Sequence, residues 1–142
     1  MNSDYDLERF LEAQSFSYAY ALREIQGGRK QTCWMWYIFP QLRGLGISYN
    51  SQYYGIADIH EARAYLAHPV LGTRLRELCA VILSLEGNDP RALMGSPDDK
   101  KLQSSMTLFA NATEDNEVFL AVLEKYYGGA QDLATLGILN MQ

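Results

Sequence analysis

The residues with the clearest potential for chemistry lie in one short stretch of two acids, two lysines and two serines: Asp98, Asp99, Lys100, Lys101, Ser104 and Ser105. On a helix, Lys101 is three residues from Ser104 and four from Ser105, so its amine could contact either hydroxyl. A lysine held away from water can activate a serine as a nucleophile, and Asp98 is the candidate acid or base. We favour a structural interpretation, in which the acids complement the helix dipole and the serines bond to the helix backbone.

A second stretch, residues 28–48, is the most aromatic part of the chain and contains both tryptophans. Its apolar run, residues 34–39, predicts a short buried helix that Thr32 caps and that ends before Pro40, with a buried strand as the alternative. Successive positions on a helix point about 100° apart, so Trp34 and Trp36 cannot both face the same core. A plain core role is favoured for both, but one of them could form the wall of a pocket.

The sequence contains few other residues that could bind a ligand or a metal. Lys30 precedes the aromatic helix and could meet an anion near its free N–H groups, although a solvated surface charge is the simpler interpretation. The stretch around it does not have the spacing of a phosphate loop. His60 and His68 are the only histidines, and no cysteine pairs with them at ligand spacing, so we predict no metal and no cofactor. Cys33 is a weak candidate nucleophile, since no partner base can be named.

Apolar residues recur at helical spacing, and caps, glycines and prolines separate the runs. Nine helical segments are predicted, two of them single turns, which amount to about eight helices: a long one from a Ser3 or Asp4 cap to Gly27–Gly28, the aromatic helix, a turn capped by Ser48, one from the Asp58-x-x-Glu61 capping box to His68–Pro69, one from there to Gly87, one turn over 91–94 that Asp89–Pro90 opens, one that Ser96 caps with Pro97 first and that includes Phe109, one over 115–127, and a last one capped by Asp132. We predict an all-α fold, a single compact globular domain of seven to eight helices over residues 1–142, around a buried aromatic helix.

Composition restricts the class of protein further. The net charge of −5 argues against a nucleic-acid partner, since no stripe of Lys and Arg could displace counterions. The first ten residues are acidic and lack an apolar segment, and no apolar run is long enough to span a membrane. The two cysteines form no recognisable framework, which indicates reduced thiols. These features predict a cytoplasmic protein.

Three motifs carry a resemblance to a known family. They are Lys30-x-x-x-Trp34–Met35–Trp36–Tyr37–Ile38–Phe39–Pro40–Gln41-x-x-Gly44–Leu45–Gly46, then Glu61–Ala62-x-x-Tyr65–Leu66-x-His68–Pro69-x-Leu71–Gly72-x-Arg74–Leu75, then Gly95–Ser96–Pro97–Asp98–Asp99-x-Lys101–Leu102-x-Ser104–Ser105–Met106–Thr107–Leu108–Phe109. From about Leu7 to Leu139 the chain resembles the domain-of-unknown-function family 1810, whose members are small all-helical bacterial domains. Many members have histidine where this chain has Cys33. Some members are called calpastatin, a name that the dense apolar core and the lack of repeats do not support.

The resemblance implies that polar motif residues from separate segments could converge on one cleft beside a tryptophan. We expect a pocket that binds a small anionic ligand, in the style of nucleotides, ADP-ribose or NAD-derived molecules. Whether the protein also processes the ligand, as an enzyme, stays open. The expected ligand-binding residues are Lys30, Trp34, Trp36, Gln41 and Arg74, and the expected catalytic residues are Asp98, Lys101 and Ser104. The alternative is a non-catalytic interaction or regulatory module with a protein partner or a second copy, in which these polar residues are structural.

Overall fold

The computed structural model describes residues 5–142, which form nine helices: α1 (Glu8–Gln26), α2 (Met35–Ile38), α3 (Tyr49–Tyr53), α4 (Ile59–Ala67), α5 (Leu71–Ser84), α6 (Pro90–Met94), α7 (Asp98–Ala110), α8 (Glu117–Tyr127) and α9 (Leu133–Met141). One isolated parallel bridge, between Leu42 and Ile56, is the only β pairing in this range. The all-α prediction is therefore confirmed. The predicted cap at Ser3 or Asp4 lies outside the described residues.

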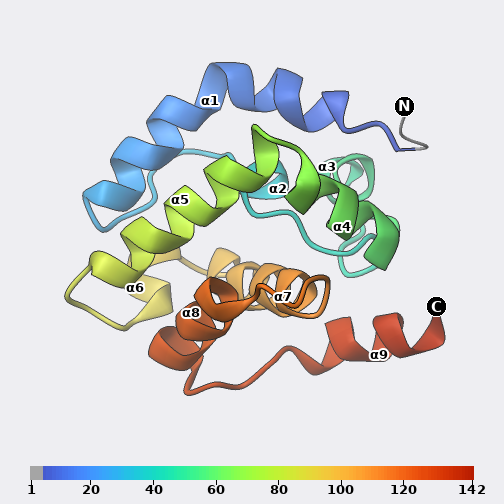
Figure 1. Ribbon diagram of the computed structural model, residues 1–142. Helices are drawn as coiled ribbons and strands as arrows, with labels where there is room; N and C mark the ends of the chain where they lie inside the picture. Colours follow the sequence, from blue (N-terminus) through green and yellow to red (C-terminus); the bar gives the residue numbers. More distant parts are fainter. Residues whose placement is uncertain (1–4) are drawn as a thin grey trace.

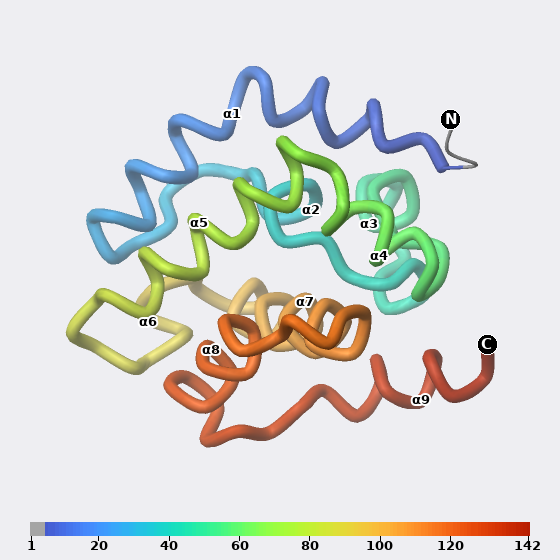
Figure 2. Tube along the Cα trace, viewed as in Figure 1, coloured from blue at the N-terminus to red at the C-terminus, as the bar shows by residue number. Residues whose placement is uncertain are grey.

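Helix α5 occupies the middle of the molecule, where it packs against α1, α4 and α8. In Figure 1, α1 crosses on one side of α5, and α7 and α8 lie on the other side. The short aromatic helix α2 packs against α1. Figure 2 shows the chain leaving α8 through a long extended connection and then forming α9, which packs on α7.

A chain of aromatic rings joins the layers through the core. Phe10 of α1 meets Tyr65 of α4 edge-on at 5.1 Å between ring centroids. Tyr65 in turn lies 5.3 Å from Phe109 of α7, and Phe109 lies 5.9 Å from Phe119 of α8. All four rings are completely buried. Such pairs add attraction beyond the burial of their apolar area, so they tie four helices to one core.

The predicted helix starts are confirmed wherever a hydroxyl or carboxylate cap stands next to its helix. The side chains of Ser48, Asp58, Asp89 and Asp132 accept backbone N–H groups at the starts of α3, α4, α6 and α9. Such bonds satisfy donors that the first helical turn leaves free. These contacts are local, which is why the sequence alone predicts them.

Two predicted caps are wrong. Helix α2 begins at Met35 with Trp34 as its N-cap residue, and Thr32 instead bonds the side chain of Glu24. Helix α7 begins at Asp98, so Pro97, and not Ser96, holds the position before the helix. Both helices start later than predicted. The hydroxyl of Thr32 bonds Glu24 and does not cap α2, and Pro97 takes the N-cap position of α7.

Candidate ligand-binding site

Asp98, in the first turn of α7, joins two lysines from different parts of the chain. Its carboxylate lies 2.9 Å from Nζ of Lys30 and 3.6 Å from Nζ of Lys101. The side chains of Lys30, Asp98 and Lys101 are 10%, 18% and 25% exposed, respectively. The structure therefore brings three of the predicted site residues together, with one negative charge between two positive charges.

Each of these lysines also lies over one tryptophan ring. Nζ of Lys30 is 5.0 Å from the ring centre of Trp34, and Nζ of Lys101 is 5.6 Å from that of Trp36. A lysine ammonium is attracted to an aromatic face at such distances. Trp34 is only 1% exposed and belongs to the core, whereas Trp36 is partly exposed. The two tryptophans thus have different environments, as their spacing predicted.

A pocket opens beside Trp36. Its lining comes from α2 and the segment after it, from α3 and the residues that follow, and from α7: Met35, Trp36, Phe39, Gln41, Asn50, Ser51, Tyr54, Gly55 and Lys101. The bridge between Leu42 and Ile56 brings Gln41 next to the segment that follows α3, since the Gln41 carbonyl accepts the Ile56 N–H at 2.9 Å. The volume open to the centre of a water-sized sphere is about 10 Å³, which is the room that one water molecule needs.

Polar groups in this pocket are available to a ligand. The side-chain amides of Gln41 and Asn50 make no hydrogen bond to any other described residue, and the hydroxyl of Ser51 is bonded only to Ser48. The ammonium of Lys101 shares its one carboxylate partner with Lys30. Two amide-bearing residues and a lysine therefore line a small space bounded by aromatic rings, and aromatic walls with a few polar groups are also what small-ligand sites contain.

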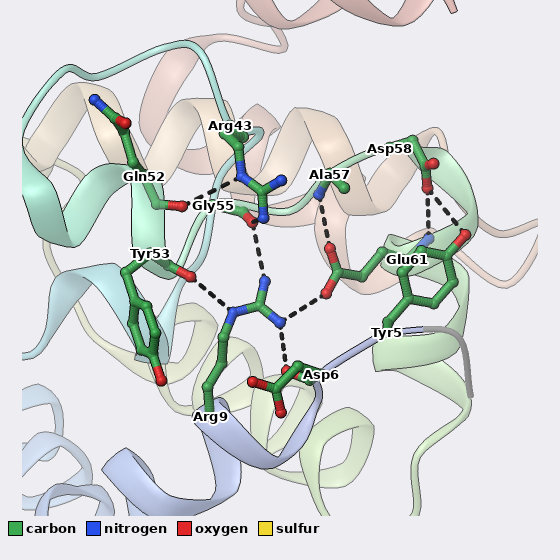
Figure 3. Close-up of polar contacts among 10 residues, drawn as sticks. All are labelled: Tyr5, Asp6, Arg9, Arg43, Gln52, Tyr53, Gly55, Ala57, Asp58 and Glu61. Carbon is green, nitrogen blue, oxygen red and sulfur yellow. Dashed lines mark hydrogen bonds and ion pairs between the residues drawn. The ribbon is translucent and has the colours of Figure 1, made fainter. Parts of the chain in front are cut away.

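A buried ion pair supports the wall of the pocket from behind (Figure 3). Arg9 of α1 lies 2.9 Å from Glu61 of α4, and their side chains are 5% and 2% exposed. The same guanidinium donates to the carbonyls of Tyr53 at 2.8 Å and of Gly55 at 3.0 Å, and Arg43 donates to the Gly55 carbonyl at 3.1 Å. Since Gly55 lines the pocket, Arg9 connects that wall to its own helix, α1, and through Glu61 to α4.

Glu24, near the end of α1, organises the loop that carries Lys30. Its carboxylate accepts the backbone N–H groups of Gln31 and Thr32, the Thr32 hydroxyl, and the indole N–H of Trp34 at 2.9 Å. Burial alone would raise the pKa of Glu24, but these hydrogen bonds outweigh it and lower that pKa from 4.5 to about 2. The indole of Trp34 is therefore used inside the fold and is not free for a ligand.

Of the eight predicted site residues, only Trp36, Gln41 and Lys101 line the pocket. Two of the others, Ser104 and Arg74, also lie outside the Lys30–Asp98–Lys101 cluster. The hydroxyl of Ser104 bonds Asp132 at 3.1 Å and the carbonyl of Lys100 at 3.2 Å, so it helps to seat the start of α9. Arg74 lies over the ring of Tyr18 at 4.8 Å and donates to Gln14 at 3.3 Å, and it does not line the pocket beside Trp36. The structure therefore shows Ser104 bonded to an acid and not to Lys101.

Sequence reasoning missed several residues of the site and its support. Asn50 and Tyr54 follow the Ser48 cap, and a short helix there was predicted, but nothing in the sequence indicated which core it would face. Arg9 is a charge within an otherwise apolar helix face, and such a charge is seldom buried without a partner. That signal could have pointed to a buried ion pair, although not to Glu61 as its partner.

Other candidate groups have simpler environments. His68 accepts the N–H groups of Val70 and Leu71, and His60 is exposed. Cys33 is exposed, while burial raises the pKa of Cys79 to about 12. Residues 5–142 contain no group of three or more His, Cys, Asp or Glu side chains that could hold a metal ion. In the same range, no helix is both long and apolar enough to cross a bilayer.

Comparison with known proteins places the chain in a family. The sequence model of the family described as "Protein of unknown function (DUF1810)" matches residues 4–139. The chain belongs to this family. Its fold is similar to the crystal structure of the conserved hypothetical protein Rv1873 from Mycobacterium tuberculosis, with a TM-score of 0.97 and 46% sequence identity over 99% of this chain and 100% of that one. No curated protein matches the chain.

Proposed function

We propose that this DUF1810 protein binds a small anionic molecule in the pocket beside Trp36. The observation that carries the proposal is the convergence of Lys101, Gln41 and Asn50 on one aromatic-lined space, with both amides unpaired in the described structure. Lys101 supplies the charge, the amides supply hydrogen bonds, and the ring of Trp36 contacts an apolar or planar part of the ligand. Both amides are partly exposed, so a ligand that displaces water from them must hydrogen-bond them in its place.

The pocket has room for only about one water molecule, so the bulk of any ligand lies at its mouth. A terminal group enters, and the remainder extends over Trp36 and Tyr54. Nucleotides, ADP-ribose and NAD-derived molecules remain the ligand classes to test first. Should the protein process its ligand, Asp98 is the candidate acid or base, because its carboxylate lies 3.6 Å from Lys101, which lines the pocket.

The test is a thermal-shift screen of the purified protein against nucleotides, ADP-ribose, NAD and common carboxylates. A ligand at one hundred times its dissociation constant stabilises the fold by about 2.7 kcal/mol. Lys101→Gln should abolish the shift. Lys100→Gln is the matched control, because Lys100 is the neighbouring lysine, is exposed and does not line the pocket, and it should leave the shift unchanged.

Tryptophan fluorescence then locates the ligand. Since Trp36 lines the pocket and Trp34 is buried, a ligand-dependent change should disappear in Trp36→Phe. A shift that survives both Lys101→Gln and Trp36→Phe would refute this site. Incubation of any confirmed ligand with the protein, followed by mass spectrometry, shows whether it is converted, and Asp98→Asn should then block conversion.

One observation favours the alternative, an interaction module without chemistry. Tyr49 and Tyr53 stack in parallel at 5.8 Å on the outside of α3, and Tyr49 and Ile47 are 77% and 92% exposed. Exposed apolar side chains that lie together mark contact surfaces in many proteins. If this is the function, a co-purifying protein is lost with Ile47→Asp and retained with Lys101→Gln.

A further inference from the structure

A second hollow lies at the C-terminal end of α1 and shares no lining residue with the pocket beside Trp36. The volume open to the centre of a water-sized sphere is about 270 Å³, compared with about 10 Å³ beside Trp36. Its lining comes from the last turns of α1 and the loop that follows: Tyr20, Arg23, Glu24, Gly27, Arg29 and Gln31. The hollow therefore has room for a small ion or molecule, with two arginines in its wall.

Both of these arginines lack a partner that bonds their charge. Eight of the twelve Lys and Arg side chains form an ion pair or a hydrogen bond within the described chain. The four that form neither are Arg23, Arg29, Arg91 and Lys100, and the first two line the same hollow. The chain has 17 acidic residues, so a shortage of acids does not explain two unpaired arginines at one place.

The guanidinium of Arg23 is held in position without using its N–H groups. Its central carbon lies over the ring of Tyr20, 5.2 Å from the ring centre, one helical turn earlier on α1. A guanidinium on an aromatic face is attracted to the ring while its N–H groups remain free at the edges. Tyr20 therefore orients Arg23 and leaves its hydrogen-bond donors available to a ligand.

The backbone around Arg29 is also fixed. Its N–H group donates to the Glu24 carbonyl at 3.1 Å, the next N–H donates to the Leu93 carbonyl at 2.7 Å, and the N–H of Gln31 donates to the Glu24 carboxylate at 2.7 Å. The side-chain amide of Gln31 lines the hollow and bonds no other described residue. The loop thus presents an arginine and an amide from a backbone that is hydrogen-bonded on both sides.

One carboxylate in the lining opposes the binding of an anion. Glu24 carries a negative charge, so the three charged side chains of the hollow sum to +1. Four hydrogen bonds from the loop already satisfy that carboxylate. Glu86 and Asp89 line an adjoining hollow and are exposed, so water screens their charges. The net attraction is small but positive, and hydrogen bonds from the arginines must supply most of the affinity.

Two guanidinium groups suit a phosphate group better than a carboxylate. One guanidinium can pair with both oxygens of a carboxylate, whereas a phosphate offers further oxygens to a second guanidinium. We propose that this hollow is a second anion site, independent of the pocket beside Trp36, in which Arg23 and Arg29 bind the oxygens of one phosphate group. The amide of Gln31 supplies an additional donor.

Titration with inorganic phosphate at pH 7 tests the proposal, with sodium acetate and sodium chloride at matched ionic strength as comparisons. The Nε–H resonances of Arg23 and Arg29 in ¹H–¹⁵N spectra report binding at the site. We expect phosphate to shift both resonances to saturation and to bind at least about tenfold more tightly than acetate or chloride, as one additional hydrogen bond between charged groups implies. Equal effects of the three salts would overturn the proposal.

Substitutions then locate the phosphate. Arg23→Gln and Arg29→Gln should each weaken binding at least about tenfold, followed through the resonance of the arginine that remains. Arg91→Gln is the matched control, because Arg91 is also exposed and unpaired in the described chain but lies outside the hollow. It should leave phosphate binding unchanged. Affinity that survives Arg23→Gln and Arg29→Gln would refute the site.

Lys101→Gln separates this site from the proposed function. It should abolish the binding of a ligand beside Trp36 and leave phosphate binding at the end of α1 intact. Loss of phosphate binding in Lys101→Gln would instead place the phosphate beside Trp36 and overturn the second site.

Tyr20 gives a test that leaves every charge in place. Tyr20→Leu should weaken phosphate binding by about threefold, because Arg23 loses the ring that orients it. Tyr20→Phe keeps the ring and should retain the affinity of the wild type. Equal affinities in Tyr20→Leu and Tyr20→Phe would overturn the positioning role of the ring.

Discussion

Glu24 shows how one side chain can organise a loop that periodicity cannot predict. Its carboxylate accepts four hydrogen bonds from residues 31–34, and it thereby positions the segment from which Lys30 reaches Asp98. Hydrogen bonds to an ionised group are stronger than those between neutral groups. The ionised form of Glu24 is therefore the form that stabilises the fold.

The ionisation of Glu24 makes the stability of the fold depend on pH. The pKa of Glu24 is lowered from 4.5 to about 2 in the folded protein, so its contribution is fully present above about pH 4.5 and is lost as pH falls towards 2. Glu24→Gln should cost about 1–2 kcal/mol of unfolding free energy near pH 7. The difference from wild type should shrink as pH falls from 4.5 to 3, as measured by urea unfolding.

Glu12→Gln is the control for this experiment, because Glu12 is an exposed acid on the same helix. It should change the unfolding free energy by less than about 0.5 kcal/mol, with little dependence on pH. A Glu24→Gln penalty that stays constant down to pH 3 would contradict the assignment of the effect to the carboxylate.

At the level of elements, the junction between α4 and α5 depends on a glycine. A Cβ atom at Gly72 would lie 2.1 Å from the carbonyl oxygen of Leu66 in α4, which is a backbone atom and cannot rotate away. The chain can therefore turn from α4 into α5 this tightly only without a side chain at residue 72. This turn places α5 against α1 and α8 in the centre of the molecule.

Gly72→Ala should destabilise the protein by about 3 kcal/mol or more, because the two helices must separate. Gly137→Ala is a matched change, since Gly137 also lies within a helix and an added Cβ would meet nothing within 4 Å. It should stabilise by up to about 1 kcal/mol through the better helix propensity of alanine. Thermal and urea unfolding of both variants measure the contrast, and similar values for the two would refute the steric argument.

At the scale of the whole molecule, Arg9 connects the N-terminal helix to the wall of the pocket. It bonds Glu61 of α4 and the carbonyls of Tyr53 and Gly55, so it joins segments that are far apart in the sequence. Removing one partner of a buried ion pair leaves the other charge without compensation. Folding and the shape of the pocket should therefore respond together.

Arg9→Met should cost about 3–5 kcal/mol of unfolding free energy and weaken ligand binding at the Trp36 pocket. Asp115→Asn is the comparison: Asp115 is 77% exposed and lies 3.8 Å from Arg76, and its loss should cost less than about 1 kcal/mol. The double variant Arg9→Met/Glu61→Gln should lose less than the sum of the single losses, since no unpaired charge remains. Additive losses would show that the two side chains act independently.

Local sequence determined where most helices begin and end. Caps such as Ser48, Asp58 and Asp132 bond N–H groups only three residues away. These contacts are local, so they depend little on how the remainder of the chain packs. The apolar spacing likewise determined that the described chain is all-α and that Trp34 and Trp36 would lie in different environments. Thr32 and Ser96 were mispredicted as caps because nothing local showed that Glu24 would bond Thr32 or that the next helix would begin after Pro97.

Only the tertiary structure decided which polar residues meet. Lys101 and Ser104 lie one turn apart on α7, yet Lys101 meets Asp98 and Trp36 while Ser104 meets Asp132 of the α9 cap. Arg74 belongs to the same motif set and lies over Tyr18. Sequence spacing determines the direction in which a side chain leaves its helix, but its partner comes from whichever distant segment packs there. The pocket beside Trp36 exists because three such segments meet.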